Sequence, residues 1–277
     1  MSRLIDVIKW GATLGSGEQN FLGARWIQTL LKRAPEAKRR EYALKILSLS
    51  PHYFLDAGDP RYNGYSRQQY LDEAFRTGRE GRQRIYDEIL KDRLSPDYIV
   101  IDYGCGPGFL ARVLAQNVKQ VYAFDISPGV LACARILNDE PNLEYVVADT
   151  NGFAAVPDNS VDAVVSIAMV QHLSDEIFDL VLDKCARKLR LGGKLIMHVH
   201  LLEDGWKSED DWKADTSVKG KIKYKYGLHC FGRTANELIA KVSSHGFAEI
   251  DIQPIAQMVS EKFDDICSEH LLTAVKS

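Results

Sequence analysis

Three glycines, Gly104, Gly106 and Gly108, stand within five residues in the segment VIDYGCGPGFLARVLAQ (100–116). A glycine-rich turn between a strand and a helix lets backbone N–H groups and the positive end of the helix approach a ligand closely. The position of the loop does not identify that ligand. Its spacing is G-x-G-x-G, and Phe109 stands where the dinucleotide fingerprint needs a third glycine, which disfavours a nicotinamide-dependent oxidoreductase. No G-K-[ST] follows, which excludes a P-loop.

Two acidic residues stand at the ends of the next two predicted strands. Asp125 ends the first of these strands, and Asp149 ends the second. Because the carboxyl ends of parallel strands meet at one edge of an open α/β sheet, Asp125 can accept hydrogen bonds from both hydroxyls of a ribose. The polar residues that begin at Asp149 suit the edge of a purine. The glycine loop and the two acids together predict one adenosine-shaped site.

The elements that position these residues follow an alternating pattern. Short apolar runs alternate with amphipathic segments, which predicts an α/β fold with an open parallel sheet and helices on both faces. The expected strands are 98–103, 120–125, 143–149, 161–170, 193–200, 247–255 and 270–277, and the expected helices between them are 107–118, 127–138, 174–190 and 235–244.

The segments outside this alternation have another character. Residues 1–95 contain helix-like stretches at 3–14, 18–34, 36–48 and 66–93, and we expect them to form a helical cap on the sheet rather than an independent domain. Residues 201–233 show no clear period, and a long irregular segment in a compact domain is usually functional. We therefore divide the chain into a cap or lid (1–95) and a ligand-binding domain (96–277), with 201–233 as a substrate-side insertion.

Composition excludes several classes of protein. The formal net charge of −3 over 277 residues provides no global positive field for nucleic acid, so we expect a small-molecule partner. Five scattered cysteines without a C-x-x-C pair fit a reducing compartment and argue against a structural zinc site. Asp6 and Lys9 interrupt the apolar N-terminal stretch, which argues against a secretory signal or a membrane span. We expect a cytoplasmic protein.

With these elements in order, the chain resembles class I S-adenosylmethionine-dependent methyltransferases of the small-molecule type. The resemblance is strong over 98–200 and weak over 234–277. It is carried by the segments VIDYGCGPG, AFDIS, VVADTNGFAAVPDNSVDAVVS, AMVQHL and LRLGGKLIMHV. It implies a Rossmann-like, seven-stranded, mostly parallel sheet with a C-terminal antiparallel strand pair. It also implies S-adenosyl-L-methionine as the cofactor.

The resemblance assigns cofactor contacts to individual residues. Asp102 and the glycine loop would surround the methionine moiety, Asp125 would hold the ribose, Ile126 would flank the adenine, and Asp149 would bind the adenine amine. The residues after the fourth strand would face the methyl group. The predicted cofactor set is Asp102, Gly104, Cys105, Gly106, Gly108, Asp125, Ile126, Asp149, Thr150 and Ala168. For Gly108 a simpler reading stays open, in which Pro107 and Gly108 only open a helix.

Three histidines are candidates for a general base, which is needed only if the acceptor holds its proton at neutral pH. His172 follows the fourth strand, where it either acts as a base or orders the turn; His200 ends the fifth strand; and His229 lies in the insertion. His198 and His200 share one face of a strand, with Glu203 and Asp204 nearby. We expect no metal site, because no third ligand stands at a fixed spacing.

The acceptor site is expected between the N-terminal helices and the insertion. The predicted substrate contacts are Tyr65, Met169, Trp206 and Tyr226, with Tyr53, Tyr62 and Tyr65 of 52–66 forming a lid. Alternating lysines in 219–226 predict a charge-protected edge strand, or else a basic aromatic surface for an anionic partner. The basic stretch 32–40 is interpreted as a solvated helix face, with a membrane-surface or RNA role as the alternative.

The sequence thus predicts an enzyme that transfers a methyl group by in-line displacement to O, N or C of a small organic acceptor, including secondary-metabolite-like or lipid-like molecules. Two alternatives stay open: a methyltransferase acting on RNA, and a cofactor-binding module without catalysis. The acceptor, the atom methylated and the oligomeric state are left open by the sequence.

Overall fold

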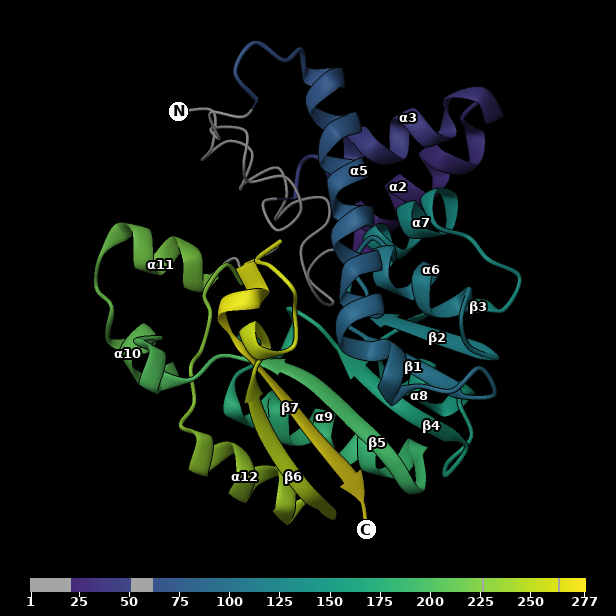
Figure 1. Ribbon diagram of the computed structural model, residues 1–277. Coiled ribbons are helices and arrows are strands. Elements are labelled where there is room, and N and C mark those ends of the chain that lie inside the picture. The colour runs from purple at the N-terminus through teal and green to yellow at the C-terminus, as the bar shows by residue number, and fades with distance from the viewer. Residues whose placement is uncertain (1–20, 51–61, 226, 264) are drawn as a thin grey trace.

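Seven strands form one sheet at the centre of the protein (Figure 1). The computed structural model describes residues 21–50, 62–225, 227–263 and 265–277. The strand order is β3-β2-β1-β4-β5-β7-β6, in which the first five strands are parallel and β7 runs antiparallel to both of its neighbours, β5 and β6. The bounds are β1 Ile99–Tyr103, β2 Gln120–Asp125, β3 Leu143–Val147, β4 Val161–Ser166, β5 Leu189–Val199, β6 Phe247–Pro254 and β7 His270–Lys276. The predicted fold class is confirmed.

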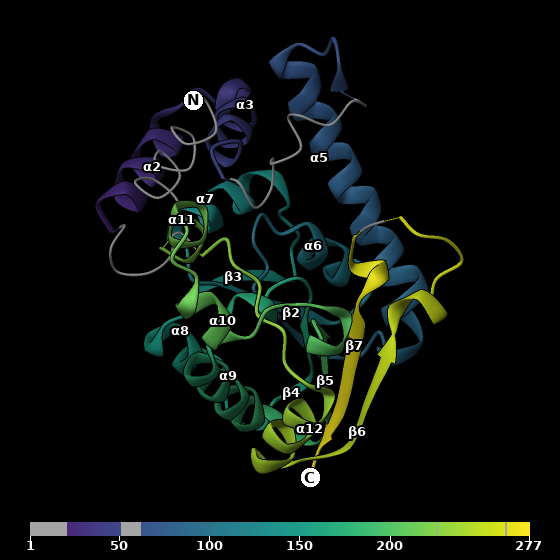
Figure 2. The ribbon, with the colours of Figure 1, turned by 90° about the vertical axis from the view of Figure 1, so that its left-hand side faces the viewer.

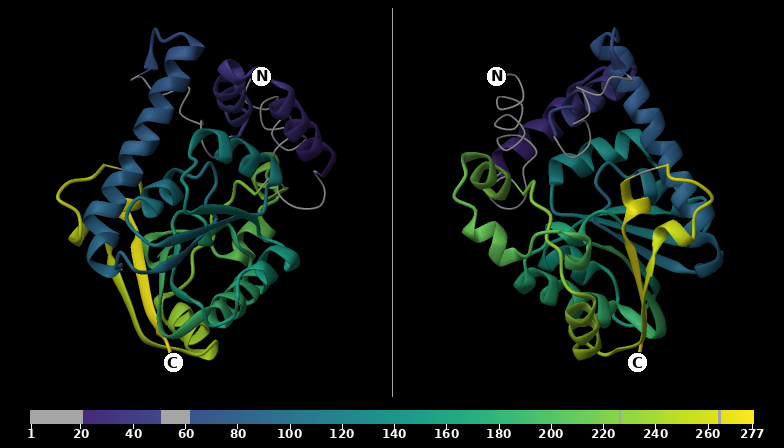
Figure 3. Two further views of the ribbon diagram at one scale, coloured as in Figure 1. Left: turned by 90° about the vertical axis from the view of Figure 1, so that its right-hand side faces the viewer. Right: turned by 60° about the vertical axis from the view of Figure 1, so that its left-hand side comes forward.

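Helices cover both faces of this sheet (Figure 2, Figure 3). One layer holds α5 Arg67–Arg84, α6 Phe109–Ala115 and α7 Pro128–Leu137, and the other holds α8 Thr150–Ala155, α9 Asp175–Lys188 and α12 Ala235–Ser244. Short helices connect these elements: η5 Val170–His172, η6 Leu202–Asp204, η7 Ile255–Gln257 and η8 Asp265–Ser268. No helix in the described ranges combines the length and apolar composition needed to cross a membrane.

The central strands are apolar on both sides because each side packs on a helix layer. In β1, Val100 belongs to the core beneath α6, whereas the next residue, Ile101, belongs to the core beneath α9. Both side chains are almost completely buried. Successive side chains of a strand point to opposite faces, so a continuous apolar run is what a doubly covered parallel strand requires.

An N-terminal cap packs on the outer side of α7. Its helices are α2 Phe21–Arg33 and α3 Glu36–Leu47, close to the predicted 18–34 and 36–48. The predicted helix at 3–14 and Tyr53 of the predicted lid lie outside the described residues. One apolar cluster joins the three helices, with Ile27, Leu44 and Leu47 from the cap and Cys133 from α7. The cap therefore shares an apolar cluster with α7, which itself packs on β2 and β3.

The predicted helix 66–93 is also confirmed, with a change of geometry near its end. Ser66 and Gln69 form a capping box at the start of α5. After Arg84 the chain continues as a π-helix, η3 Ile85–Leu90, and a 3-10 turn, η4 Lys91–Arg93. α5 passes alongside α6 and projects beyond the strands at its N-terminal end (Figure 1).

The predicted edge strand at 219–226 is wrong. The insertion holds two helices, α10 Glu209–Ala214 and α11 Val218–Lys225, which lie beside the sheet (Figure 1). Ser217 begins α11, because its hydroxyl oxygen accepts a hydrogen bond from the Gly220 N–H at 2.9 Å. Lysines at every second position of a helix point in different directions, so they do not form the single charged face that a strand would have.

Candidate active site

The glycine loop connects β1 to α6 and is held against the end of β2. The N–H groups of Gly104 and Cys105 donate hydrogen bonds to the carbonyl oxygen of Phe124 at 2.8 and 2.9 Å. Gly104 and Gly108 have φ values of +83° and +80°, in the left-handed region that favours glycine. Gly108 is the residue that begins α6. The loop therefore turns its backbone toward the end of the neighbouring strand.

Neighbouring side chains also require glycine at two of these positions. A Cβ atom on Gly104 would lie 2.2 Å from Cγ of Met169, and one on Gly108 would lie 2.1 Å from the Tyr145 hydroxyl. The Tyr145 hydroxyl donates to the Asn138 carbonyl oxygen at 2.7 Å, and the Asn138 side-chain amide donates to the Pro107 carbonyl oxygen at 2.8 Å. Gly108 thus does more than open a helix, because the buried Tyr145 occupies the place of its side chain.

Asp125 lies at the end of β2 and faces this loop. Its carboxylate accepts hydrogen bonds from the backbone N–H groups of Gly106 at 3.0 Å and Ser127 at 2.8 Å. Burial raises the pKa of Asp125 to about 6, and the two hydrogen bonds act in the opposite direction. The adjacent Ile126 is 51% exposed, an unusual state for a large apolar side chain beside a buried strand end. A carboxylate and an apolar surface are thus adjacent, as the predicted ribose and adenine contacts require.

Asp102 is buried in β1 at the start of the loop. Its Oδ2 atom has no hydrogen-bond partner among the described residues. Burial raises its pKa to about 7; Arg82 of α5 lowers the pKa, and Asp125 raises it further. Arg82 is not among the predicted site residues, because nothing in its spacing distinguishes it from the other arginines of that helix.

Asp149 has a structural task in addition to its predicted contact. It is the N-cap of α8, and its Oδ1 accepts a hydrogen bond from the Gly152 N–H at 2.7 Å. Its side chain remains exposed at the end of β3. Thr150 is the first residue of α8, and its side chain lies outside what the structure describes.

The chain after β4 contacts the glycine loop from the other side. β4 ends at Ser166, four residues earlier than predicted, and the Ser166 hydroxyl donates to the Tyr103 carbonyl oxygen at 2.8 Å. Ala168 has φ +59°, which costs free energy for a residue with a Cβ atom. This turn places Met169 against Gly104. Met169 therefore lies next to the loop, and the contacts predicted for Ala168 with the cofactor and for Met169 with the acceptor stay predictions.

His172 and His229 join the end of β4 to the insertion. Nδ1 of His172 lies 2.6 Å from the carbonyl oxygen of His229, so this side chain links the turn after β4 to the insertion. The ring of His229 stacks on Tyr224 with centroids 5.0 Å apart and contacts Phe231 at 4.3 Å. Burial lowers the pKa of both histidines.

His200 and Trp206 form a pair of stacked rings just after the end of β5. Their rings stack with centroids 3.8 Å apart, and Nε1 of Trp206 donates to Oε2 of Glu269 at 3.0 Å. Burial lowers the pKa of His200 to about 4. His198, on the same face, is only 1% exposed, and its ring centroid lies 5.2 Å from that of His200.

Nearby acids do not join these histidines in a metal centre. Glu203 accepts a hydrogen bond from the Ala235 N–H at 3.2 Å, and Asp204 lies 3.2 Å from Nδ1 of His270. The described part of the chain contains no group of three His, Cys, Asp or Glu side chains able to hold a metal ion.

Three predicted residues remain to be placed. Tyr65 precedes α5, is 45% exposed and contacts Tyr62 edge to face at 5.8 Å. Cys105 is buried within the loop, and burial raises the pKa of its thiol well above the ordinary value. Tyr226 lies outside the described residues.

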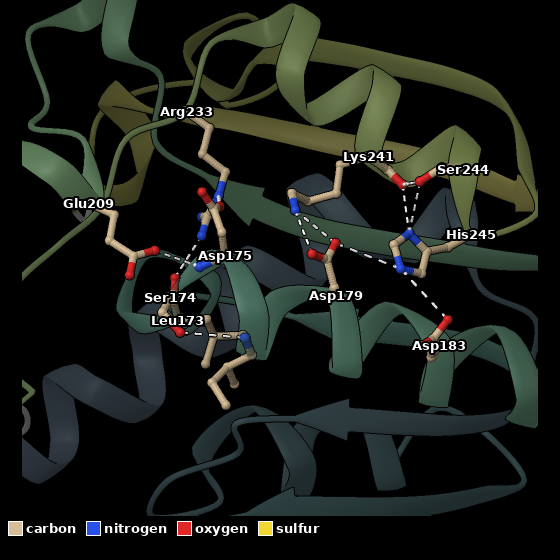
Figure 4. A network of polar contacts seen from close by, with 11 residues as sticks. Leu173, Ser174, Asp175, Asp179, Asp183, Glu209, Arg233, Lys241, Ser244 and His245 are labelled. Atoms are coloured by element: carbon tan, nitrogen blue, oxygen red, sulfur yellow. Dashed lines mark hydrogen bonds and ion pairs between the residues drawn. The ribbon is translucent and has the colours of Figure 1, made fainter.

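A pocket of about 340 Å³ lies apart from the glycine loop, where the insertion meets α9 and α12. Figure 4 shows the contacts beside it. Arg233 donates from Nε to Asp175 and from Nη2 to the Leu173 carbonyl oxygen, both at 2.7 Å. Glu209 accepts a hydrogen bond from the Asp175 N–H at 2.7 Å, and Lys241 is paired with Asp179 at 2.7 Å. These contacts attach the insertion and α12 to α9. We therefore assign the polar residues around this pocket to holding the insertion in place, and not to the cofactor site.

Comparison with known proteins finds relatives for the part of the chain that holds the glycine loop and most of the parallel strands. Residues 101–197 match the family model described as "Methyltransferase domain". The chain is 35% identical over 100 residues to ubiquinone biosynthesis O-methyltransferase of Xanthomonas oryzae pv. oryzae, which covers 35% of this chain and 41% of the relative. The protein of the same name from Xanthomonas campestris pv. campestris is 33% identical over 104 residues, covering 37% and 43%. The chain thus matches about two-fifths of the length of these relatives.

Two solved structures share the fold. One is a chain from the complex between the Haloferax volcanii Trm112 methyltransferase activator and a methyltransferase, with a TM-score of 0.51 and 18% identity over 73% of this chain and 96% of that one. The other is Haemonchus contortus phosphoethanolamine N-methyltransferase 2, with a TM-score of 0.50 and 17% identity over 76% and 58%. At these identities the likeness shows the fold alone.

Proposed function

We propose that this chain, which carries a class I S-adenosylmethionine-dependent methyltransferase domain, binds S-adenosyl-L-methionine and transfers its methyl group to a small organic acceptor. The relatives named as ubiquinone biosynthesis O-methyltransferases support an acceptor of this size. The five cysteines are free, which supports a reducing compartment such as the cytoplasm.

One observation carries the proposal: the buried Asp102 carboxylate, the glycine loop and the Asp125 carboxylate lie in sequence along one edge of the sheet. The unpartnered Oδ2 of Asp102 fits the ammonium group of the methionine moiety, because a buried carboxylate needs a cationic or hydrogen-bonding partner. Asp125 suits the ribose hydroxyls, and Ile126 provides an apolar surface for the adenine. The residues present therefore fit the cofactor.

The cofactor supplies, when bound, a methyl group attached to a positively charged sulfur. The task of the protein is to align the acceptor with that group and to exclude water. Met169 lies against Gly104 on the β4 side of the loop. Two ring contacts follow β5 in the chain, His200 with Trp206 and His229 with Phe231, and we call these four residues the aromatic wall. We assign acceptor contacts to this wall.

Isothermal titration calorimetry with S-adenosylhomocysteine tests the proposal. Asp125→Asn should weaken binding about 10- to 100-fold, because it removes the charge from a hydrogen-bond acceptor at the ribose. The matched control is Asp162→Asn at the opposite end of the sheet, where Asp162 accepts from the Ile99 N–H at 2.7 Å and from Arg190 at 2.6 Å. The control should bind within about twofold of the wild type, since a single distant change leaves other sites nearly unaffected.

Absence of binding in the wild type, or equal affinity in the Asp125 variant, would refute the proposal. Incubation with methyl-labelled S-adenosylmethionine and a cell lysate then separates the alternatives. Label in small molecules supports the proposed function. Label that ribonuclease destroys favours an RNA acceptor, and a protein that binds the cofactor but labels nothing is a binding module.

A further inference from the structure

Buried polar atoms without partners gather where β1 and β5 end. Among the described residues, Oδ2 of Asp102, both ring nitrogens of His198 and Nδ1 of His200 have no hydrogen-bond partner. Folded proteins pair nearly all such atoms, so an unpaired group calls for a ligand or water. Asp102 is explained by the proposed cofactor. His198 of β5 and His200, which follows that strand, are not.

The position of His198 relates it to the acceptor side of the site. In the sheet register, Met197 pairs with Ser166, the last residue of β4, so His198 lies beside the turn that leads to Met169. His198 and His200 point to the face that carries Ile196, on which η3 and α6 also pack. Both histidines therefore lie one strand away from the residues that contact the glycine loop.

Arg82 relates His198 to the cofactor end of the same site. The charge of Arg82 lowers the pKa of Asp102 and also that of His198. An effect on both groups requires that Arg82 lie near both, since Coulomb interactions weaken with distance. The charge of Arg82 therefore acts both on His198 and on the carboxylate assigned to the methionine moiety.

The two rings are arranged as fixed hydrogen-bonding groups. Their planes cross at 86° with centroids 5.2 Å apart, and Trp206 stacks on His200 at 3.8 Å and fixes the orientation of that ring. A neutral imidazole has one N–H donor and one nitrogen acceptor. A hydroxyl group likewise donates one hydrogen bond and accepts others, so it can satisfy both rings at once.

We propose that His198 and His200 form the subsite that binds the reacting hydroxyl of the acceptor, so that the substrates of this protein are hydroxyl compounds methylated at oxygen. This rests on the proposed function above. The acceptor oxygen forms the new C–O bond as the C–S bond of the donor breaks and leaves its electron pair on sulfur. The hydroxyl proton passes to a free ring nitrogen of His198, which takes up the positive charge that the sulfonium loses.

The charge state of the histidines supports this role. Burial lowers the pKa of His198 well below its ordinary value and that of His200 to about 4, so both rings are neutral at pH 7 and each keeps a nitrogen lone pair for a hydroxyl. Because burial also makes the rings weaker bases, the proton moves only as the methyl group arrives and the acceptor oxygen becomes positively charged. An acidic acceptor group would need a cationic partner instead. A neutral hydroxyl needs a base, which is what a neutral imidazole supplies.

The first experiment identifies the atom that is methylated. Wild-type protein is incubated with methyl-labelled S-adenosylmethionine and the small-molecule fraction of a lysate, and the products are treated with hydriodic acid. This reagent releases O-methyl groups as methyl iodide and leaves C-methyl groups in place, and mass spectrometry separates N-methyl products. We expect the label in O-methyl groups.

The second experiment compares His198→Phe with His245→Phe. His198→Phe keeps a ring of similar size and removes both nitrogens, so O-methyl labelling should fall about 100-fold or more. The affinity for S-adenosylhomocysteine, measured by calorimetry, should stay within about threefold. His245 lies at the end of α12, where it contacts Asp179 and Asp183, and its variant should retain labelling. If His198→Phe does not fold, His198→Asn replaces it.

The outcomes separate this inference from the proposed function. A wild type that binds S-adenosylhomocysteine but labels only nitrogen or carbon, or labels nothing, overturns the hydroxyl subsite and leaves the cofactor assignment standing. Undiminished labelling in a His198→Phe protein that binds the cofactor product also overturns it. A wild type that fails to bind S-adenosylhomocysteine removes both proposals.

Discussion

Gly108 shows how one residue meets two independent constraints. Its φ of +80° disfavours any residue with a Cβ atom, and the Tyr145 hydroxyl occupies the place where that atom would stand. Tyr145 in turn bonds to Asn138, which bonds to the carbonyl oxygen of Pro107. The loop that would hold the cofactor is thus braced from behind by a buried phenol and an amide.

Two glycine substitutions separate these constraints. Gly108→Ala should lower the free energy of unfolding by about 3 kcal/mol, because backbone strain and overpacking against Tyr145 add. Gly246→Ala has a similar φ of +82° with no atom within 4 Å of its Cβ position, so it should lose only about 1 kcal/mol. Urea unfolding measures both. Equal losses in the two variants would show that the contact with Tyr145 carries no weight.

Among the secondary-structure elements, α9 is the one to which the insertion is anchored. Arg233, the last residue of the insertion, is 6% exposed, and its guanidinium lies 4.9 Å from the ring centroid of Phe178. It also bonds to the carbonyl oxygen that precedes the helix and to Asp175 in its first turn (Figure 4). A segment that would carry acceptor contacts is thereby attached to a rigid helix.

Loss of this anchor should cost more than loss of an exposed ion pair. Arg233→Met keeps the apolar stem and leaves the Leu173 carbonyl oxygen without its partner, so we expect a loss of about 2 kcal/mol in unfolding free energy. Lys213→Met removes an exposed pair with Glu209 and should cost no more than about 0.5 kcal/mol. Thermal unfolding of the two variants checks this. A Lys213 variant as unstable as the Arg233 variant would contradict it.

The elements that the sequence predicted correctly depend on local signals. Apolar runs locate the strands, and Ser66, Ser127 and Ser174 each cap a helix through their own side chains. α11 was mistaken for a strand because its alternating lysines have the period of a strand, while the capping by Ser217 decided for a helix. The lysine pattern and the serine are both visible in the sequence, but the sequence alone does not show which of the two signals is stronger.

The parts of the site that the sequence could not predict depend on contacts between distant residues. Asp125 and Asp149 could be found in the sequence, because each stands at the end of a predicted strand. The contact of Tyr145 with Gly108 and the approach of Arg82 to Asp102 join residues far apart in the chain. The unpartnered nitrogens of His198 are likewise a property of the packed structure.

Across the whole molecule, α7 connects the N-terminal cap to the sheet. Leu44 of α3 and Phe75 of α5 are buried in the same cluster as Cys133 and Leu137 of α7. α7 also packs on β2 and β3 through its other side. We propose that the cap is not an independent domain, because without it α7 would expose a large apolar face.

A cavity in the cap should therefore destabilise the whole molecule. Leu44 is 3% exposed, and Leu44→Ala should lower the unfolding free energy by about 2–4 kcal/mol. Scanning calorimetry should show one transition that moves as a unit, because α7 packs both on the cap and on the sheet. Val218→Ala, at a side chain that is 76% exposed, should change the stability by less than about 0.5 kcal/mol. A Leu44→Ala trace that splits, with one peak at the wild-type temperature, would show that the cap unfolds on its own and that the sheet does not depend on it.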